Sequence, residues 1–179
     1  KLKNNCWEDD FMRIFLGSDH VGVKIKGKVK SFLENEGYEV EDCGAYNYDK
    51  DDDYPDFIGK AADGVSQDPD NTLGIVFGGS GQGEAMVANK YNGVRCALFY
   101  SKAIPTESIN IEGNQSIDPY EMLKLTKEHN QANVLSIGIR FLKEEEILIA
   151  IKLWLNAPFT NEPRHKRRID KIKEIEKLQ

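Results

Sequence analysis

A run of glycines that surrounds a serine and ends in a glutamate is the sequence feature that points most directly to a bound ligand. Residues 78–84 read GGSGQGE and lie between an apolar segment and a predicted helix. Glycines let the backbone approach a ligand closely, and the N–H groups at the start of the helix would face its negative charge. The run is neither a Walker motif nor a GxGxxG motif. We interpret it as a phosphate or oxyanion cradle, and a tight turn without a ligand is the alternative.

Glu84 lies where the helix after this run is predicted to begin. The helix dipole and the nearby N–H groups should favour the ionised form of its carboxyl group. An ionised carboxylate beside an oxyanion cradle could accept a proton from a substrate. A glutamate in a first helical turn is also common as a simple partner of the helix dipole, so both interpretations stay open for Glu84 taken alone.

Two further groups of polar residues follow predicted strands. Asp19 and His20 offer a carboxylate and an imidazole side by side, which suits acid–base chemistry or the binding of hydroxyl groups. Asp19 could equally cap the helix that follows it. Arg140 comes after the last predicted strand. Because ligands of open α/β sheets bind beyond the carboxyl ends of the strands, we expect these residues to meet the glycine run.

A basic cluster, RHKRR at residues 164–168, contrasts with an acidic chain that has 24 Lys and Arg against 30 Asp and Glu, a net charge of -6. A nucleic-acid-binding protein usually has a basic excess, so we expect no nucleic acid as a partner. Arg164 and Arg168 are four residues apart and would share one face of a helix, where both could bind one phosphate. With Arg140 they would form an electropositive pocket for a small anion, and a solvated charged face is the alternative.

The rest of the chain must position these groups. Short apolar runs alternate with segments whose apolar residues recur at helical spacing, which is typical of parallel βαβ units with helices on both faces of one sheet. The pattern predicts an α/β fold with a doubly wound five-stranded parallel sheet, a flavodoxin-like or Rossmann-like αβα sandwich. We expect strands at residues 13–17, 39–43, 73–77, 95–100 and 133–137, and helices at 24–36, 55–66, from about 84, 120–129, 143–156 and within 164–179.

A chain of 179 residues fits a single domain. We interpret residues 1–11 as an N-terminal extension, 12–160 as the α/β domain with a loop insertion at about 101–117, and 161–179 as its C-terminal basic helix. Three cysteines without metal-like spacing suggest a reducing compartment. Neither a signal peptide nor an apolar run of the ~18 residues needed to cross a membrane is visible. These features favour a cytoplasmic protein without a membrane partner.

At the level of whole motifs, the chain resembles the type B ribose-5-phosphate isomerases and their galactose-6-phosphate isomerase relatives. The likeness covers nearly all of residues 12–179. Many members carry a catalytic cysteine at the first position of the glycine loop, where this chain has Gly78, and a second branch uses a glutamate at the position of Glu84 as its base. The chain is similar to that glutamate branch. The matching motifs are GSDHVGVKIK (17–26), DYPDF (53–57), GGSGQGEAMVANK (78–90), GVRCAL (93–98), KEHNQANVLSIGIR (127–140) and RHKRR (164–168).

The resemblance implies an aldose–ketose isomerase that interconverts ribose 5-phosphate and ribulose 5-phosphate through a cis-enediol. Glu84 would move the proton between C2 and C1, Ser80 and the neighbouring N–H groups would stabilise the enediolate, and Asp19 and His129 would open the furanose ring. An isomerase of a six-carbon sugar phosphate, such as allose or galactose 6-phosphate, is the first alternative, and a non-catalytic sugar-phosphate-binding or nucleotide-binding module is the second. The implied substrate-binding residues are His20, Tyr54, Gly79, Gly81, Gly83, Asn130, Arg140, Arg164, His165 and Arg168.

The resemblance also implies how the site is assembled. No metal and no cofactor are expected, and the partner is a small sugar phosphate. Sites of the family are built from two subunits, so we expect a homodimer or a dimer of dimers. The insertion at 101–117 departs from the family, whose connection at this point is far shorter. We expect it to fold away, to cover the site or to alter the choice of substrate.

Overall fold

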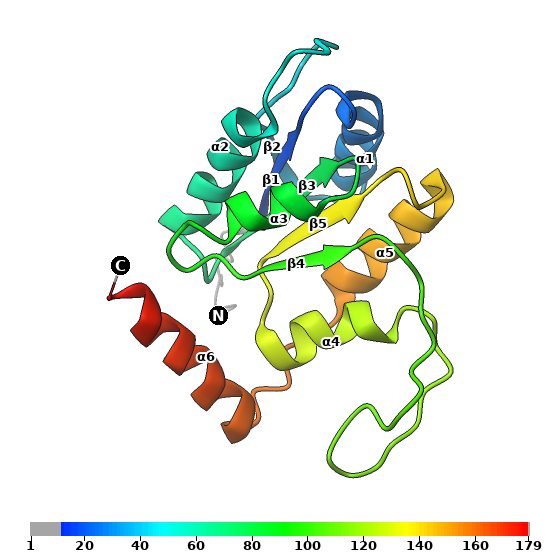
Figure 1. Ribbon diagram of the computed structural model, residues 1–179, viewed down its shortest axis with the longest axis vertical. Helices are drawn as coiled ribbons and strands as arrows, with labels where there is room; N and C mark the ends of the chain where they lie inside the picture. The colour runs from blue at the N-terminus through cyan, green and yellow to red at the C-terminus, as the bar shows by residue number, and fades with distance from the viewer. Residues whose placement is uncertain (1–11, 179) are drawn as a thin grey trace, which may run out of the picture.

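The computed structural model describes residues 12–178, so the predicted extension at 1–11 lies outside the described residues. Its centre is one parallel sheet with the strand order β2-β1-β3-β5-β4 (Figure 1). The order reverses direction beside β1, as in a doubly wound sheet, and the five-stranded α/β fold predicted from the sequence is confirmed. The strands are β1 (Arg13–Ser18), β2 (Glu39–Asp42), β3 (Thr72–Gly78), β4 (Cys96–Phe99) and β5 (Val134–Gly138).

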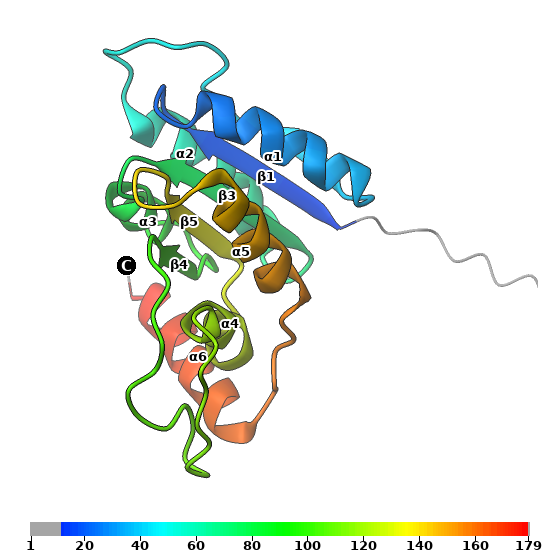
Figure 2. The same ribbon diagram turned by 90° about the vertical axis from the view of Figure 1, so that its right-hand side faces the viewer.

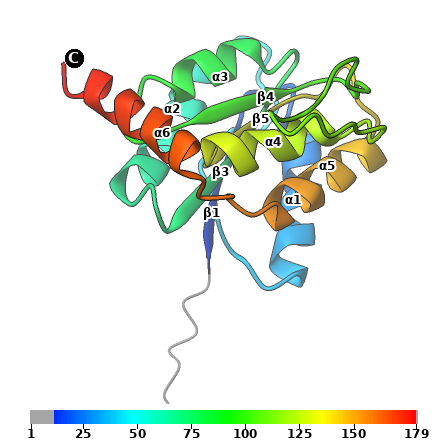
Figure 3. The same cartoon turned by 90° about the horizontal axis from the view of Figure 1, so that it is seen from below.

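Helices cover both faces of the sheet. Figure 3 shows the sheet between two helical layers, with α2 and α3 on one face and α1, α4 and α5 on the other. Buried apolar side chains fill both interfaces, which explains why the central strands read as continuous apolar runs. The helices are α1 (Val23–Asn35), α2 (Tyr54–Gln67), α3 (Gln82–Ala88), α4 (Glu121–Asn130), α5 (Glu144–Asn156) and α6 (Pro163–Glu176).

The C-terminal helix α6 stands apart from the two layers and lies beside α4 (Figures 1 and 2). His165 and Ile169 on its inner side are buried. Ile172 and Ile175 near its end are 41% and 57% exposed, and a cavity of about 440 Å³ lies between them and the start of β4. The predicted basic helix is therefore present, but most of its apolar side chains are uncovered in a single chain. Among residues 12–178, no helix combines the length and the apolar character that crossing a membrane requires.

The segment between β4 and α4 contains no helix or strand over residues 100–120, in agreement with the loop predicted there. It leaves the carboxyl end of β4 and runs past α4 (Figure 1). The two ends of the loop lie together, because the Ala103 N–H donates to the Pro119 carbonyl at 3.0 Å. Lys102 pairs with Glu146 at 2.5 Å, which fixes the first end to α5. We call residues 101–117 the insertion loop.

Candidate active site

The carboxyl ends of β1, β3 and β5 bring the predicted polar groups together. A Cβ atom placed on Gly79 would lie 3.0 Å from the guanidinium carbon of Arg140, so the Arg140 head group lies on the loop backbone. A Cβ atom on Gly83 would lie 2.7 Å from the Tyr54 hydroxyl oxygen. This group, which we call the carboxyl-edge cluster, comprises Asp19, His20, Tyr54, Gly79, Ser80, Gly81, Gly83, Glu84 and Arg140.

The glycine run is held in place by hydrogen bonds to β5 and to the residues that follow it. The Ser136 hydroxyl, which is buried, donates to the Gly81 carbonyl at 2.6 Å. The N–H groups of Ile139 and Arg140 donate to the carbonyls of Gly78 and Gly79 at 3.0 and 3.1 Å. Gly81 has a φ of 74°, in the region that favours glycine. The loop is therefore a preorganised backbone element, as an oxyanion cradle requires.

Glu84 lies in the first turn of α3 and its side chain is buried, with 5% of the residue exposed. Its carboxylate rests on the backbone of Gly78, and a Cβ atom at position 78 would overlap it. A cysteine at position 78 and a glutamate in this orientation therefore exclude each other sterically. The geometry agrees with a glutamate-based site, because the Glu84 carboxylate occupies the space that a side chain at position 78 would need.

The electrostatic surroundings of Glu84 differ from the prediction. Burial raises the pKa of the Glu84 carboxyl group above its usual value, the negative charge of Asp19 raises it further, and a backbone N–H group lowers it. The expectation that the helix terminus would favour ionisation is wrong, because desolvation outweighs the N–H contribution. A raised pKa makes the carboxylate a stronger proton acceptor near neutral pH.

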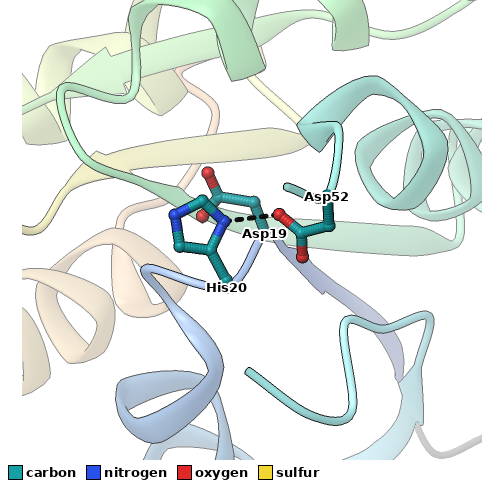
Figure 4. Close-up of side chains that lie close together, drawn as sticks. All are labelled: Asp19, His20 and Asp52. Atoms are coloured by element: carbon teal, nitrogen blue, oxygen red, sulfur yellow. Dashed lines mark hydrogen bonds and ion pairs between the residues drawn. The ribbon is translucent and has the colours of Figure 1, made fainter. Parts of the chain in front are cut away.

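His20 and Asp19 occupy the end of β1 beside this loop. Asp19 is not a helix cap, because its carboxylate accepts a hydrogen bond from the Val21 N–H at 3.0 Å and α1 begins after Gly22. His20 Nδ1 lies 2.5 Å from Asp52 Oδ1 (Figure 4). Asp52 was not a candidate from the sequence, and the only signal for it is its place in the acidic run that precedes Tyr54.

Asp19, His20 and Asp52 also form a group of potential ligand atoms that lie within 4.8 Å of one another. A divalent cation could in principle be held at such spacing. The Nδ1 atom of His20 is engaged by the Asp52 carboxylate. The His20–Asp52 hydrogen bond thus accounts for the arrangement of these side chains without a metal ion.

The remaining predicted residues form a second group where α4 ends and α6 begins. The rings of His129 and His165 lie 4.2 Å apart between centroids. His165 is 2% exposed, and its Nδ1 lies 2.9 Å from the Thr160 hydroxyl oxygen. Burial lowers the pKa of His165, and the neighbouring charge of His129 adds to this effect. We call this group, His129, Asn130, Arg164, His165 and Arg168, the amino-edge cluster.

The two clusters lie at opposite ends of the parallel strands, the carboxyl-edge cluster at their carboxyl ends and the amino-edge cluster at their amino ends. Asn130 precedes β5 and Arg140 follows it, so the five residues of this strand separate them. At about 3.3 Å per residue, the strand spans roughly 16 Å. Within one chain, Arg140 therefore lies apart from Arg164 and Arg168, and the predicted pocket lined by all three would need residues of two chains. The charge pattern of the sequence could not show this separation, because it does not indicate at which end of the strands each segment lies.

Known proteins similar to this chain point to one family. Residues 14–117 and 114–172 match the sequence profile of the family Ribose/Galactose Isomerase. The chain is 42% identical over 166 residues to ribose-5-phosphate isomerase B of Mycolicibacterium paratuberculosis, covering 93% of this chain and 92% of the relative. It is 39% identical over 166 residues to ribose-5-phosphate isomerase B of Mycobacterium tuberculosis, covering 93% and 91%.

Solved structures give the same result. The fold is similar to the crystal structure of ribose-5-phosphate isomerase B from Mycoplasma genitalium with bound ribulose-5-phosphate, with a TM-score of 0.80 and 35% identity. That match covers 93% of this chain and 97% of the other. A second match, to ribose-5-phosphate isomerase B of Clostridium thermocellum, has a TM-score of 0.77 and 35% identity, and covers 93% of this chain and 99% of that one.

Proposed function

This chain belongs to the ribose/galactose isomerase family, and from that premise we propose that it is an aldose–ketose isomerase that interconverts ribose 5-phosphate and ribulose 5-phosphate. The observation that carries the proposal is the buried Glu84 carboxylate, which lies against a preorganised glycine loop and has a raised pKa. A protein that only binds a sugar phosphate has no need of such a base. The relatives named above are ribose-5-phosphate isomerases, and the crystal structure of the Mycoplasma genitalium enzyme contains bound ribulose-5-phosphate.

In the proposed reaction, Glu84 takes a proton from C2 of the opened sugar, and the electron pair of the broken C–H bond forms the C1–C2 double bond of the cis-enediol while the carbonyl oxygen O1 gains negative charge. Glu84 then returns its proton to C1 as the C2–O2 carbonyl forms, and the proton released from the O2 hydroxyl is balanced by the proton that O1 takes up. The Ser80 hydroxyl and the N–H groups of Gly79, Gly81 and Gly83 stabilise the negative charge on O1. Asp19, which lies close enough to influence the pKa of Glu84, opens the furanose ring together with His129.

A complete site of this kind takes residues from both clusters. His20 and Arg140 bind phosphate in the carboxyl-edge cluster, and Tyr54 lines the pocket. In the amino-edge cluster, Arg164 and Arg168 complete the phosphate site, His165 lines the pocket, and Asn130 binds a sugar hydroxyl. The separation of the clusters by β5 supports a homodimer, or a dimer of dimers, in which one chain's amino-edge cluster completes the partner's carboxyl-edge cluster. The uncovered apolar side chains of α6 also support such a contact. We further propose that the enzyme acts in the cytoplasm.

The test of the proposed function is an isomerisation assay of the purified protein with a panel of five- and six-carbon phosphosugars, with and without a chelator. We expect turnover of ribose 5-phosphate and ribulose 5-phosphate that a chelator leaves unchanged. A clear preference for a six-carbon phosphosugar would show that the protein is instead an isomerase of a six-carbon sugar phosphate within the same family. Absence of turnover with every phosphosugar would contradict the enzymatic role.

Arg140→Ala is expected to raise KM for ribose 5-phosphate by about 10- to 150-fold and to change kcat little. The phosphate keeps its charge throughout the reaction, so its binding energy is lost in the ground state and the transition state alike. A charge-assisted hydrogen bond contributes roughly 1.5–3 kcal/mol. Arg13→Ala, which removes the same side chain at the other edge of the sheet where it pairs with Glu39 at 2.8 Å, is the matched control. An unchanged KM in Arg140→Ala would place the phosphate elsewhere.

Replacing the insertion loop with a short linker is expected to change substrate preference or KM more than stability. Residues 103 and 119 are hydrogen bonded, so a short linker can join them. The cost of closing a loop grows slowly with its length, and we expect the free energy of unfolding to change by about 1 kcal/mol or less. The effect on substrate is expected because the loop lines one cavity of about 620 Å³ together with Asn130, a proposed substrate-binding residue.

Thermal melts and kinetics on the same truncated protein separate these effects. Loss of the fold together with loss of the dimer would show that the loop is a structural bridge. Unchanged kinetics with every phosphosugar would show that the insertion loop has no role in substrate binding.

A further inference from the structure

We propose that Asp52 is a positioning residue for His20: its carboxylate holds the imidazole by Nδ1 so that the protonated Nε2 faces the substrate's phosphate group. This inference rests on the proposed function, in which His20 binds phosphate. Asp52 would not touch the substrate itself. Its role is to fix the orientation and the charge of the group that does.

The contact between the two side chains is specific. Nδ1 of His20 and Oδ1 of Asp52 lie 2.5 Å apart, and the side chains are 21% and 8% exposed. The other oxygen of Asp52 is buried and has no hydrogen-bond partner among residues 12–178. A buried carboxylate is costly unless a charged, hydrogen-bonded partner offsets its desolvation. His20 is the side chain that meets this need, so the pair favours a charged imidazolium.

The local backbone explains why Asp52 is held at this point. Asp52 lies in the connection between β2 and α2, where its N–H donates to the Asp49 carbonyl at 3.2 Å in a tight turn. The ring of Tyr48, from the same connection, packs edge-on against His20 with 5.4 Å between ring centroids. Two side chains of one loop therefore contact the imidazole, Asp52 through Nδ1 and Tyr48 in a T-shaped ring contact.

The orientation determines which nitrogen is available to a ligand. Each neutral imidazole carries one N–H, and the hydrogen bond made by one nitrogen sets the state of the other. Because Nδ1 donates to Asp52, Nε2 is the atom left for a ligand. In the imidazolium form Nε2 is also a donor, and a charged donor to a phosphate makes a hydrogen bond about twice as strong as a neutral one.

Some of the groups around His20 raise the pKa of its imidazole, and others lower it. The hydrogen bond to Asp52 raises the pKa of His20 above 6.5, and the negative charge of Asp19 raises it further. Burial and the positive charge of Arg140, across the cluster, lower it. The net direction is upward, so the imidazolium form persists to a higher pH than in an isolated histidine.

Asp52→Asn keeps the size of the side chain but removes its charge, and it tests the proposal in two ways. The chain has three histidines, so NMR can follow the titration of each, with His20→Gln identifying the His20 signal. We expect a lower pKa for His20 in Asp52→Asn. We also expect KM for ribose 5-phosphate and Kd for inorganic phosphate to rise about 5- to 10-fold near pH 8, with kcat little changed.

The pH dependence separates positioning from a general structural role. Near pH 5, His20 is protonated in both proteins, and the amide oxygen introduced by Asp52→Asn can still accept a hydrogen bond from Nδ1, so the difference in phosphate affinity should shrink toward a factor of about one. Asp51→Asn is the matched control, because Asp51 is the neighbouring carboxylate, is 78% exposed and pairs with Lys50 alone among the described residues, at 3.6 Å. It should leave both KM and the His20 titration unchanged.

Several outcomes would overturn the proposal. The first is an Asp52→Asn protein with the original His20 pKa, and the second is an affinity loss that stays the same at every pH. If Asp52→Asn does not fold, the wild-type titration decides, because a His20 pKa at or below 6.5 contradicts the proposed pairing. Phosphate binding and NMR do not require turnover, so an inactive wild-type protein would refute the proposed function and leave this test intact.

Discussion

Glu84→Gln is expected to lower kcat for ribose 5-phosphate isomerisation by about 10²–10⁴-fold, the usual contribution of a general base. Glutamine keeps the length and shape of the side chain, so it can occupy the same buried place on the Gly78 backbone. It cannot accept the C2 proton under these conditions. KM should change little, because in the proposed mechanism the carboxylate acts on the reacting carbons and not on the phosphate.

The same variant is expected to be at least as stable as the wild type near neutral pH. Burial raises the folded-state pKa of Glu84 above its unfolded value, so the folded protein binds the proton more tightly than the unfolded chain does. The stability from this group is therefore complete at low pH and is lost as the pH rises through the folded pKa. Glutamine removes that loss. Thermal melts near pH 7 should give a Tm equal to or above that of the wild type.

The pH profile of the wild type checks the same base. With the raised pKa, kcat/KM should begin to fall on the acid side at a pH above the ordinary glutamate value of 4.5. Met86→Gln, at a position of the same helix that is 67% exposed, is the matched control and should retain full activity. Near-normal turnover by Glu84→Gln would remove Glu84 from the proton transfer.

The fold followed from the sequence because its signals are local and strong. Strands β1, β3 and β5 are buried on both faces, so they read as apolar runs, and α2 and α5 present apolar residues at helical spacing. The carboxyl-edge cluster followed as well, because parallel strands end at one edge. In such a sheet, the residues after each strand must converge.

Other features of the site depend on packing that the sequence does not display. The raised pKa of Glu84 comes from burial, which the start of a helix does not indicate. Asp52 lies in a connection without periodicity, so the sequence does not indicate that its carboxylate contacts His20. The position of α6 beside α4 likewise results from tertiary contacts, and it decides where Arg164 and Arg168 lie.

Mixing two variants of strongly reduced activity is expected to restore activity if the sites are shared between subunits. The first variant is Glu84→Gln, with its defect in the carboxyl-edge cluster. The second combines Arg164→Ala and Arg168→Ala in the amino-edge cluster, and its kcat/KM should fall by about 10²-fold or more, since two charge-assisted bonds are lost. Each homodimer then carries the same defect in both of its sites.

In a mixed dimer the two defects segregate. One site receives both of them, and the other combines an intact carboxyl-edge cluster from one chain with an intact amino-edge cluster from its partner. Random pairing of equal amounts gives about half mixed dimers, each with one intact site, so about a quarter of the wild-type activity should return. Co-expression with two different affinity tags isolates the mixed dimer, whose expected activity is about half that of the wild type.

A second mixture provides the control. Glu84→Gln and Asp19→Asn both alter the carboxyl-edge cluster, so every site of their mixed dimer keeps one defect and no activity should return. Recovery in the first mixture alone requires that a site draw on two chains, as the separation of the clusters by β5 predicts. An isolated mixed dimer of Glu84→Gln with the double arginine variant that stays inactive would show that each chain builds its site without its partner, and the arginines of α6 would then need another role.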